Sequence, residues 1–531
     1  MLSEKFLSHR ISFAAASLIL CALAFLSSCS DRKPNPNADL SLSYYHALAF
    51  PSNHISDVKV RRQLVRMVAN DKDSTLSDFF ARKYYDQRGT LVWVSRKGVI
   101  ADADTLLDRL SEIEEIGFNP SRFRIPQIRA DLKLAHSLCF DKAHPADRVL
   151  ARLEYNLTKA LFRFAAGQRF GYTVPNNLFN RLDLTDPKDP SSSYRELYAL
   201  DSPRPGKRFY KDALHEAGQG TLSAFLDSCE PHSPLYVQLV HSLHGDSARI
   251  IGRQLILVNL ERSRWRMKDY PWKHDKYVMV NLPTLHLLAK GEGEVLSMRI
   301  GCGAMKTKTP LLQGSIYRID VNPQWIMPRS IVKKSIIHRL GSRGYFASKH
   351  YFIRDRASGK NIPPYEASAD ALLNGSQLAI QEGGEGNALG RLIFRFNNGL
   401  SIYLHDTSSK GVFSQSDRDV SHGCIRVEKP FLLASFLLGK DHQKTIDKIW
   451  YSIHADVSPL GKSKEELTPE QQAVADTLKR KLLIGKADVA PKVPVFIWYY
   501  TLYPDVNGIL RTYNDLYGYD TVIYDYLRNY L

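Results

Sequence analysis

The hydrophobic pattern of the chain changes near residue 272, and this change constrains the fold more than any other feature. Before it, apolar residues recur at three- and four-residue spacing, the period of an amphipathic helix. After it, short segments alternate and are rich in β-branched residues, which indicates strands. The 531 residues are enough for two or three domains with substantial cores. The sequence therefore predicts an α+β protein, a helical region followed by a β-rich domain.

Residues 43–265 form the expected helical region. Leucine and isoleucine follow the helical period from Ala103 to Ile116, and Gly117 with Pro120 ends that helix. The same pattern predicts further helices in four segments: Leu150–Ala165, Thr221–Leu226, Leu235–Leu243 and Gln254–Trp265.

Residues 272–452 form the expected β-rich domain, with the short connections of a sandwich or barrel-like sheet. An insertion at about 326–386 interrupts it and contains a predicted helix from Ser330 to Leu340. Residues 453–531 are expected to be a C-terminal extension that packs on one of the two domains. The strands are predicted at Lys276–Leu282, Thr284–Leu288, Val295–Ile300, Ser315–Val321, Leu392–Phe396 and Leu400–Leu404.

The N-terminus carries the marks of an export signal. Lys5 and Arg10 precede an apolar run, and the small residues Ser27 and Ser28 come just before Cys29. This order resembles a bacterial lipobox, which predicts a signal peptide over residues 1–28 and lipid on Cys29. Residues 29–42 then read as a polar tether. A plainly secreted protein or an uncleaved signal anchor is the alternative.

Charge and cysteine content narrow the choice of partners. The formal net charge of +17 attracts polyanions, but no Lys/Arg run is long enough to resemble a nucleic-acid-binding tail, so we expect no nucleic acid partner. The sequence contains no CxxC pair, which disfavours a zinc ribbon. Cys139 and Cys229 are either a disulfide or two separate buried thiols. Cys302, in a glycine-rich apolar run, is expected to be a small core residue.

The segment Ser421–Arg426 reads Ser-His-Gly-Cys-Ile-Arg, and His405 precedes it by a spacer of fifteen residues. A thiol attacks carbonyl groups as its thiolate, so a catalytic cysteine needs a base or a positive environment. This segment supplies a cysteine, Cys424, two candidate bases and a flexible residue before the nucleophile. It predicts a covalent acyl-transfer site in which the sulfur is held ionised beside an imidazole.

This pattern resembles the L,D-transpeptidases with YkuD-like catalytic domains, and in particular their large scaffold-bearing, YcbB-like branch. The helical half is similar to the scaffold of that branch, and Pro494–Tyr517 to its final segment. The glycine-rich signature of the small peptidoglycan-binding module found in many members is absent between residues 206 and 256. The resemblance to the catalytic domain is carried by Val278–Pro283, Lys308–Pro310, Asn322–Pro328, Asn387–Arg391, Ile402–Thr407 and Ser421–Pro430.

The resemblance implies a β-sandwich-like catalytic domain whose inserted subdomain caps the cleft and excludes water. It implies Cys424 as the nucleophile and His405 as the base. The backbone carbonyl of Asp406 orients the imidazole in this family, whereas the Asp406 carboxylate can hold the loop.

The remaining candidates surround the nucleophile. His422 has either a secondary catalytic role or a structural one, and the N–H groups of His422, Gly423 and Cys424 are candidates for an oxyanion hole. Arg426 is either a ligand for a substrate carboxylate or half of a structural salt bridge. Ser421, Asn387 and Arg391 are further substrate-binding candidates, and Gly390 precedes the same strands. Trp325 and Tyr351 are weaker candidates, expected in packing.

The resemblance implies that the substrates are peptidoglycan stem peptides and that the protein faces the periplasm from a membrane lipid anchor. The chemistry needs no cofactor and no metal. His405, His422 and Cys424 are candidate zinc ligands, but a closed zinc site requires a fourth. Two alternatives remain open: an L,D-carboxypeptidase or amidase on the same scaffold, and a non-catalytic wall-binding lipoprotein.

Overall fold

A computed structural model describes residues 55–531 except 96, 97 and 463. The predicted signal peptide, Cys29 and the tether over residues 29–42 lie outside the described residues. Within them the chain divides into two compact units. The first contains the residues up to Gly167 with Pro205–Glu230 and Tyr530–Leu531, and the second contains Gln168–Arg204 and Pro231–Asn529.

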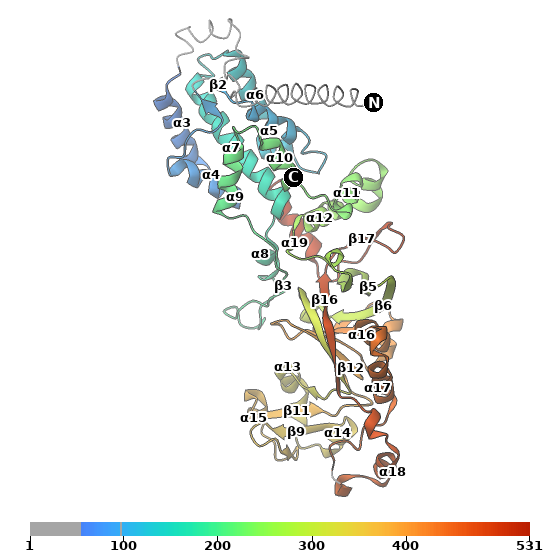
Figure 1. The fold of residues 1–531 in the computed structure, drawn as a ribbon. Coiled ribbons are helices and arrows are strands. Elements are labelled where there is room, and N and C mark those ends of the chain that lie inside the picture. The colour runs from blue at the N-terminus through green and yellow to red at the C-terminus, as the bar shows by residue number, and fades with distance from the viewer. Residues whose placement is uncertain (1–54, 96–97, 463) are drawn as a thin grey trace, which may run out of the picture. The chain divides into compact units, whose positions relative to one another are not determined.

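The first unit is helical (Figure 1). Its long helix α7 (Ala146–Phe170) is buried along almost its whole length, so the other elements pack around it. The helices expected near residues 103 and 150 are both present, the first as α5 (Asp102–Ser111) and the second as α7. The other elements are α3 (Asp57–Asn70), α4 (Leu76–Asp86), the β1–β2 hairpin (Val94–Ser95 and Gly98–Val99), α5 (Asp102–Ser111), α6 (Ile125–Ser137), α9 (Lys207–Glu216) and α10 (Leu222–Cys229).

Burial of α7 encloses polar side chains, among them the fully buried Glu154. The Glu154 carboxylate accepts hydrogen bonds from the Val92, Trp93 and Val94 N–H groups at 2.6, 2.9 and 3.1 Å. It also accepts one from the Tyr85 hydroxyl at 2.7 Å, and burial raises the pKa of Glu154. This carboxylate thus replaces the hydrogen-bond partners that the backbone before β1 lacks.

The second unit is built on a sheet that closes into a barrel. The strand order is β12-β13-β15-β6-β5-β4-β16-β7, and β7 pairs back with β12, so the outer strands meet. Of the two expected forms, the sheet therefore takes the barrel-like one. The strands are β4 (Lys276–Asn281), β5 (His286–Gly291), β6 (Glu294–Gly303), β7 (Leu311–Val321), β12 (Leu392–Phe396), β13 (Leu404–His405), β14 (Asp419–Ser421), β15 (Ile425–Val427) and β16 (Lys486–Trp498).

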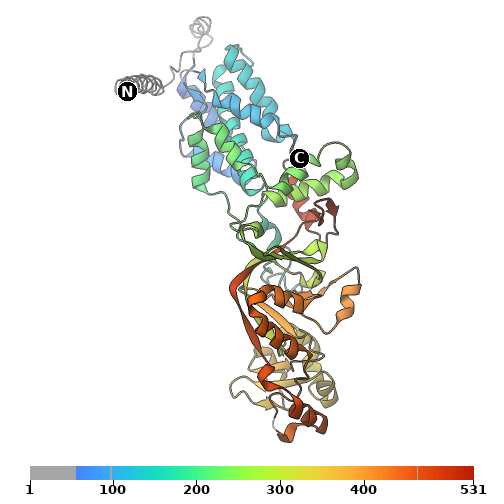
Figure 2. The same ribbon diagram turned by 45° about the vertical axis from the view of Figure 1, so that its right-hand side comes forward.

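The C-terminal segment is part of this barrel. Strand β16 lies between β4 and β7, parallel to the first and antiparallel to the second, and is visible as a long bent strand near the red end of the colour bar (Figures 1 and 2). The segment over residues 453–531, expected to be an extension that packs on one of the two domains, thus contributes a strand to the sheet itself. The remaining elements are α16 (Pro430–Leu438), α17 (Gln443–His454), α18 (Pro469–Thr477), β17 (Leu502–Pro504), β18 (Leu510–Thr512) and α19 (Tyr519–Leu527).

Part of the expected helical region also belongs to the second unit, namely α8 (Pro175–Phe179), α11 (Pro234–His241) and α12 (Arg253–Arg264). Asn259 on α12 donates to the Thr501 hydroxyl at 2.9 Å, and Arg262 forms a 2.6 Å ion pair with Asp520. These polar contacts fix α12 to the C-terminal segment, which explains why the helical boundary near 265 is not a boundary between compact units.

The insertion forms a small subdomain with its own core. Four strands order as β10-β9-β11-β8, and Trp325 and Tyr351 pack against the core, as expected. The predicted helix at 330–340 is helical but irregular, since a π-helical turn (Val332–Ile336) follows α13 (Arg329–Ile331). The other elements are β8 (Trp325–Ile326), α14 (Arg343–Ser348), β9 (Tyr351–Asp355), β10 (Asn361–Ile362), α15 (Ala369–Asn374) and β11 (Gln377–Gln381).

No helix in the described part of the chain is both long and apolar enough to span a bilayer. Cys139 is exposed and Cys229 is buried, and no disulfide joins the two. Cys302 is fully buried in β6, as expected for a core residue.

Replacing Glu154 with alanine should destabilise the first unit by at least about 2 kcal/mol. The change leaves the buried N–H groups of Trp93 and Val94 and the partly buried N–H of Val92 without an acceptor, and each buried group costs roughly 1–3 kcal/mol. Urea unfolding followed by helical circular dichroism measures the loss. Glu114→Ala, at an exposed position of the same unit, should stay within about 0.5 kcal/mol of the parent. Equal stability of the two variants would contradict this account.

Candidate active site

Strands β13 and β15 bring the predicted nucleophile and base together. They pair in parallel, with Leu404 opposite Ile425 and His405 opposite Arg426. The Ile425 N–H donates to the Tyr403 carbonyl at 3.0 Å, which extends the register back to Tyr403 and Cys424. Cys424 and His405 are therefore diagonal neighbours on one face of the sheet, with Cα atoms roughly 8 Å apart at ordinary strand spacing.

The imidazole of His405 is held by backbone carbonyl groups. Its Nδ1 lies 2.5 Å from the Asp406 carbonyl oxygen, so that carbonyl fixes the ring orientation, as the resemblance implies. His405 is buried, and burial lowers its pKa to about 4. The Asp406 carbonyl opposes this shift and the charge of Arg426 adds to it. The imidazole is consequently neutral near pH 7 and can accept a proton.

The thiol of Cys424 is protonated in this arrangement. Burial raises its pKa, and a hydrogen bond with the Tyr403 backbone only partly opposes the shift. The Sγ atom lies 3.8 Å from the Ser401 carbonyl oxygen, a suitable acceptor for the S–H group. The surroundings of Cys424 thus favour the thiol over the thiolate that the sequence predicts.

The turn before Cys424 depends on a glycine. Gly423 has φ of +116°, a conformation that side-chain-bearing residues rarely adopt. Its N–H donates to the Ser421 hydroxyl at 3.1 Å, and that hydroxyl donates to the Cys424 carbonyl. Among the three N–H groups expected in an oxyanion hole, those of His422 and Cys424 therefore remain candidates. The buried Ser421 holds the turn, which differs from the expected substrate contact.

Two threonines of the 307–309 segment hold the same turn through hydrogen bonds to its carbonyl groups. Thr309 donates to the Gly423 carbonyl at 2.8 Å, and Thr307 donates to the Ser421 carbonyl at 2.7 Å. Tyr517 accepts from the Thr309 N–H at 3.1 Å and donates to the Gly303 carbonyl at 2.7 Å. Sequence reasoning noticed the Lys308–Pro310 block without assigning it a task. Nothing local marks Tyr517, because its partners lie more than 200 positions away.

The Asp406 carboxylate holds two loops. It accepts from the Arg391 N–H at 2.8 Å and the Thr407 N–H at 2.7 Å, and it pairs with Lys410. Gly390 (φ +64°) packs so closely on Asp406 that a Cβ there would lie 2.4 Å from its Cγ. The carboxylate is therefore structural, which agrees with the role expected for it.

Asn387 and Arg391 belong to the same loop system. The Asn387 amide is fully buried and bonds to Pro323 and Glu382 carbonyls at 3.2 and 2.7 Å. The Arg391 guanidinium donates to the Asn322 side chain at 3.0 Å. Both side chains have internal partners, so they position the loop before β12. This differs from the substrate contacts expected of them.

Arg426 is the unpaired charge of the site. It lies directly opposite His405 in the strand pair and two residues after Cys424, and no ion pair joins it to a carboxylate in the described part of the chain. Its Nε atom is buried without a hydrogen-bond partner, and burial lowers the pKa of the guanidinium. A partly buried guanidinium with one unpartnered N–H group is stabilised when an anion joins it. Of the two expected roles, the geometry favours a ligand for a carboxylate.

The capping insertion contributes a second cation. His422 is largely exposed. Its remaining burial lowers its pKa, and the positive charges of Lys334 and Arg426 add to this shift. Lys334 belongs to the π-helical turn of the insertion, so this part of the insertion faces the site. Sequence analysis did not single out Lys334. Among the residues that the structure describes, no cluster of His, Cys, Asp or Glu could hold a metal ion.

Comparison with known families agrees with this geometry. Residues 275–447 match the YkuD family, the L,D-transpeptidase catalytic domain, and residues 80–243 match the scaffold domain family. The chain therefore carries an L,D-transpeptidase catalytic domain of the YkuD family together with a scaffold domain.

A putative L,D-transpeptidase of Haemophilus influenzae is 25% identical to the chain over 322 residues. The similarity covers 58% of this chain and 58% of that relative, so the chain spans a little over half of the length of the relative.

Alkylation of Cys424 by iodoacetamide should keep accelerating as pH rises above 9, because burial raises the thiol pKa and the thiolate is the reactive form. The measurement uses a chain with Cys29 and Cys139 replaced by serine and peptide mass spectrometry of the modified site. Glutathione in the same samples supplies the rate of an ordinary thiol. A midpoint below pH 7 would instead indicate a preformed ion pair.

Proposed function

We propose that the chain is a peptidoglycan L,D-transpeptidase that forms 3-3 cross-links through a cysteine thioester. Cys424 attacks the carbonyl between the third residue of a tetrapeptide stem and its terminal D-alanine. The Sγ–C bond forms, the C–N bond breaks, and D-alanine leaves with the proton that His405 took from the thiol. An amine of a second stem then attacks the thioester carbonyl, and the released sulfur regains a proton.

One observation carries this proposal: in a YkuD domain, the imidazole of His405 on β13, fixed by a backbone carbonyl, lies diagonal to Cys424, which directly precedes the paired strand β15. A neutral imidazole can remove the thiol proton as the C–S bond forms. The turn at Gly423 directs backbone N–H groups toward the region where the oxyanion develops. One such donor is worth roughly 3 kcal/mol in the transition state.

The charge of the site supports an anionic substrate. Arg426 lacks a carboxylate partner in the described chain, and Lys334 adds positive charge from the capping insertion. A tetrapeptide stem ends in a carboxylate and carries others, so it can supply the anion. The capping insertion would exclude water until the amine of the second stem attacks the thioester.

The proposal includes the compartment. Peptidoglycan lies outside the cytoplasm, and the residues before Cys29 have the order of an export signal. We infer that Cys29 carries the lipid anchor and that the enzyme faces the periplasm. Labelling with a radioactive fatty acid, compared between the parent and Cys29→Ser, tests the anchor independently of catalysis.

Cys424→Ala should abolish the mass adduct that a carbapenem forms with the chain, because the thioester requires the sulfur. His405→Ala should slow the formation of the adduct by roughly 10²–10⁴-fold without changing the fold, since a positioned base contributes that much. Intact-protein mass spectrometry over time measures both. The matched control is Cys302→Ala, whose buried thiol should leave the adduct unchanged. An adduct that survives Cys424→Ala would refute the nucleophile.

The same chain incubated with disaccharide tetrapeptides separates the reaction types. Cross-linked dimers with release of D-alanine support the transpeptidase. Tripeptides without dimers would assign the site to an L,D-carboxypeptidase instead. Unchanged substrate with no acyl-enzyme would indicate a non-catalytic protein that binds the cell wall.

Arg426→Gln should raise KM for the tetrapeptide donor by roughly 10–100-fold, because a charge-assisted hydrogen bond is worth about 1.5–3 kcal/mol. Initial rates over a range of donor concentrations measure this change. Arg356→Gln, an exposed arginine of the capping insertion, is the charge-matched control and should leave KM within twofold. An unchanged KM for Arg426→Gln would remove the assigned carboxylate contact.

A further inference from the structure

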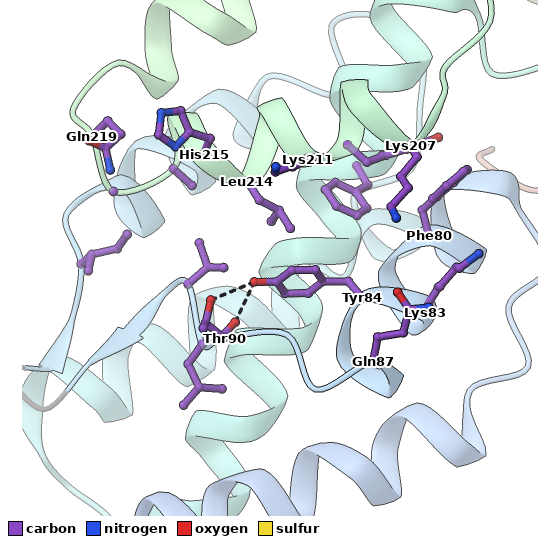
Figure 3. A pocket seen from close by; sticks show the side chains of 17 residues that line it. Phe80, Lys83, Tyr84, Gln87, Thr90, Lys207, Lys211, Leu214, His215 and Gln219 are labelled. Atoms are coloured by element: carbon purple, nitrogen blue, oxygen red, sulfur yellow. Dashed lines mark hydrogen bonds between the residues drawn. The ribbon is translucent and has the colours of Figure 1, made fainter.

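The first unit contains a cavity that the proposed reaction does not use. Its volume is about 670 Å³, within the ~300–1,000 Å³ typical of small-molecule sites. It lies between α4 and α9, and Figure 3 shows Tyr84 from α4 extending across it toward Thr90. The Tyr84 hydroxyl bonds to Thr90 at 3.0 and 3.1 Å, which fixes this ring in place.

The interior of this cavity is largely apolar. Tyr210 forms much of the wall, with the Phe80 ring stacked on it at 4.4 Å and the Phe162 ring at 4.7 Å between centroids. The Tyr210 hydroxyl is engaged with Ser77, so it faces the protein interior. The other apolar lining residues are Leu91, Val92, Ile100, Leu214 and Ala217.

The rim of the cavity is cationic. Lys207, Lys211 and His215 recur every four residues along α9, and Lys83 stands on α4. Figure 3 shows Lys207, Lys211 and His215 along the α9 side. The three lysines are exposed, none has an ion-pair partner within the described ranges, and no aspartate or glutamate lines the cavity.

The amino end of α9 adds to this potential. The ten-residue helix begins after Gly206, which supplies no side-chain cap, and its first turn has no acidic residue. The N–H groups of a helix start attract anions, phosphate above all. Lys207 is the first residue of α9, so a lysine and this helix end are adjacent at the same edge of the cavity.

From these observations we propose that the cavity binds a single-chain phospholipid, with the acyl chain against the aromatic wall and the phosphate at Lys207 and Lys211. An apolar interior with unpaired ammonium groups at its mouth complements a molecule with an apolar tail and a compact anion. Lysine is well suited to phosphate, since it acts as a point charge from any direction.

The lining argues against the wall polymer as the occupant. Sugar hydroxyls need several acceptors and donors, and the cavity offers few neutral polar side chains: Gln87, Thr90 and Gln219. Of these, Thr90 is already bonded to Tyr84. Cys424 is not among the residues that line this cavity, so the lipid proposal does not depend on the proposed transpeptidase reaction.

Binding of lysophosphatidylglycerol to the purified chain tests this proposal. Isothermal titration below the micelle concentration, with acyl chains of ten, twelve and fourteen carbons, should show affinity rising roughly fourfold per methylene, because each buried CH₂ contributes ~0.8 kcal/mol. Zwitterionic lysophosphatidylcholine of equal chain length should bind at least fivefold more weakly. Palmitate, compared with lysophosphatidylglycerol that carries the same sixteen-carbon chain, tests whether a carboxylate can replace the phosphate, and it should also bind more weakly.

The double variant Lys207→Gln/Lys211→Gln should weaken lysophosphatidylglycerol at least fivefold. Lys133→Gln on α6, exposed and outside the lining, is the matched control and should bind like the parent. Formation of the carbapenem adduct at Cys424 should be unchanged in both variants, which checks the fold apart from this cavity.

Three outcomes would overturn the proposal: affinity independent of chain length, equal binding of the zwitterionic lipid or of palmitate, and no loss in the double lysine variant. A disaccharide tetrapeptide that binds more tightly than the lipid, and loses affinity in the double lysine variant, would assign the cavity to the wall polymer and also overturn it.

Discussion

The parallel pairing of β13 with β15 is the constraint on which the active site depends. It sets the register between His405 and Arg426, and with it the diagonal placement of Cys424. A slip of one residue would send every side chain of a short strand to the other face. Two features oppose such a slip: the Asp406 carboxylate ties β13 to the loop before β12, and Thr309 ties the turn before β15 to the 307–309 segment. Strand register and loop contacts thus specify one geometry.

The electrostatics of the site follow from burial more than from ion pairing. Burial disfavours both the thiolate of Cys424 and the imidazolium of His405, and their pKa values move in opposite directions away from neutrality. Burial thus favours the neutral form of each group. In the proposed mechanism, charge would develop only as the sulfur attacks, and the backbone donors of the turn and the held imidazole would stabilise it. Such preorganisation explains why so much of the hydrogen bonding near Cys424 is internal.

The sequence predicts the chemistry of this site better than its architecture. His405 and Asp406 are adjacent, and Cys424 directly follows Gly423, so two short motifs in the sequence identify these candidates. Ser421 and Asn387 are different, because a hydroxyl or amide can bind substrate or backbone equally well and only the closed loop decides. The position of β16 as a strand of the barrel wall, between β4 and β7, likewise depends on contacts between distant segments. Strand order arises from pairing among distant segments, which alternation of apolar residues does not encode.

The unpaired Arg426 connects the resting state of the site with its specificity. An internal salt bridge would lower the cost of burying the guanidinium, but it would also bring a carboxylate close to His405. A carboxylate there would favour the imidazolium and remove the base that the thiol needs. Burial and the charge of the unpaired Arg426 both lower the pKa of His405, so they favour a neutral imidazole, and the Arg426 charge would remain available for an incoming anion.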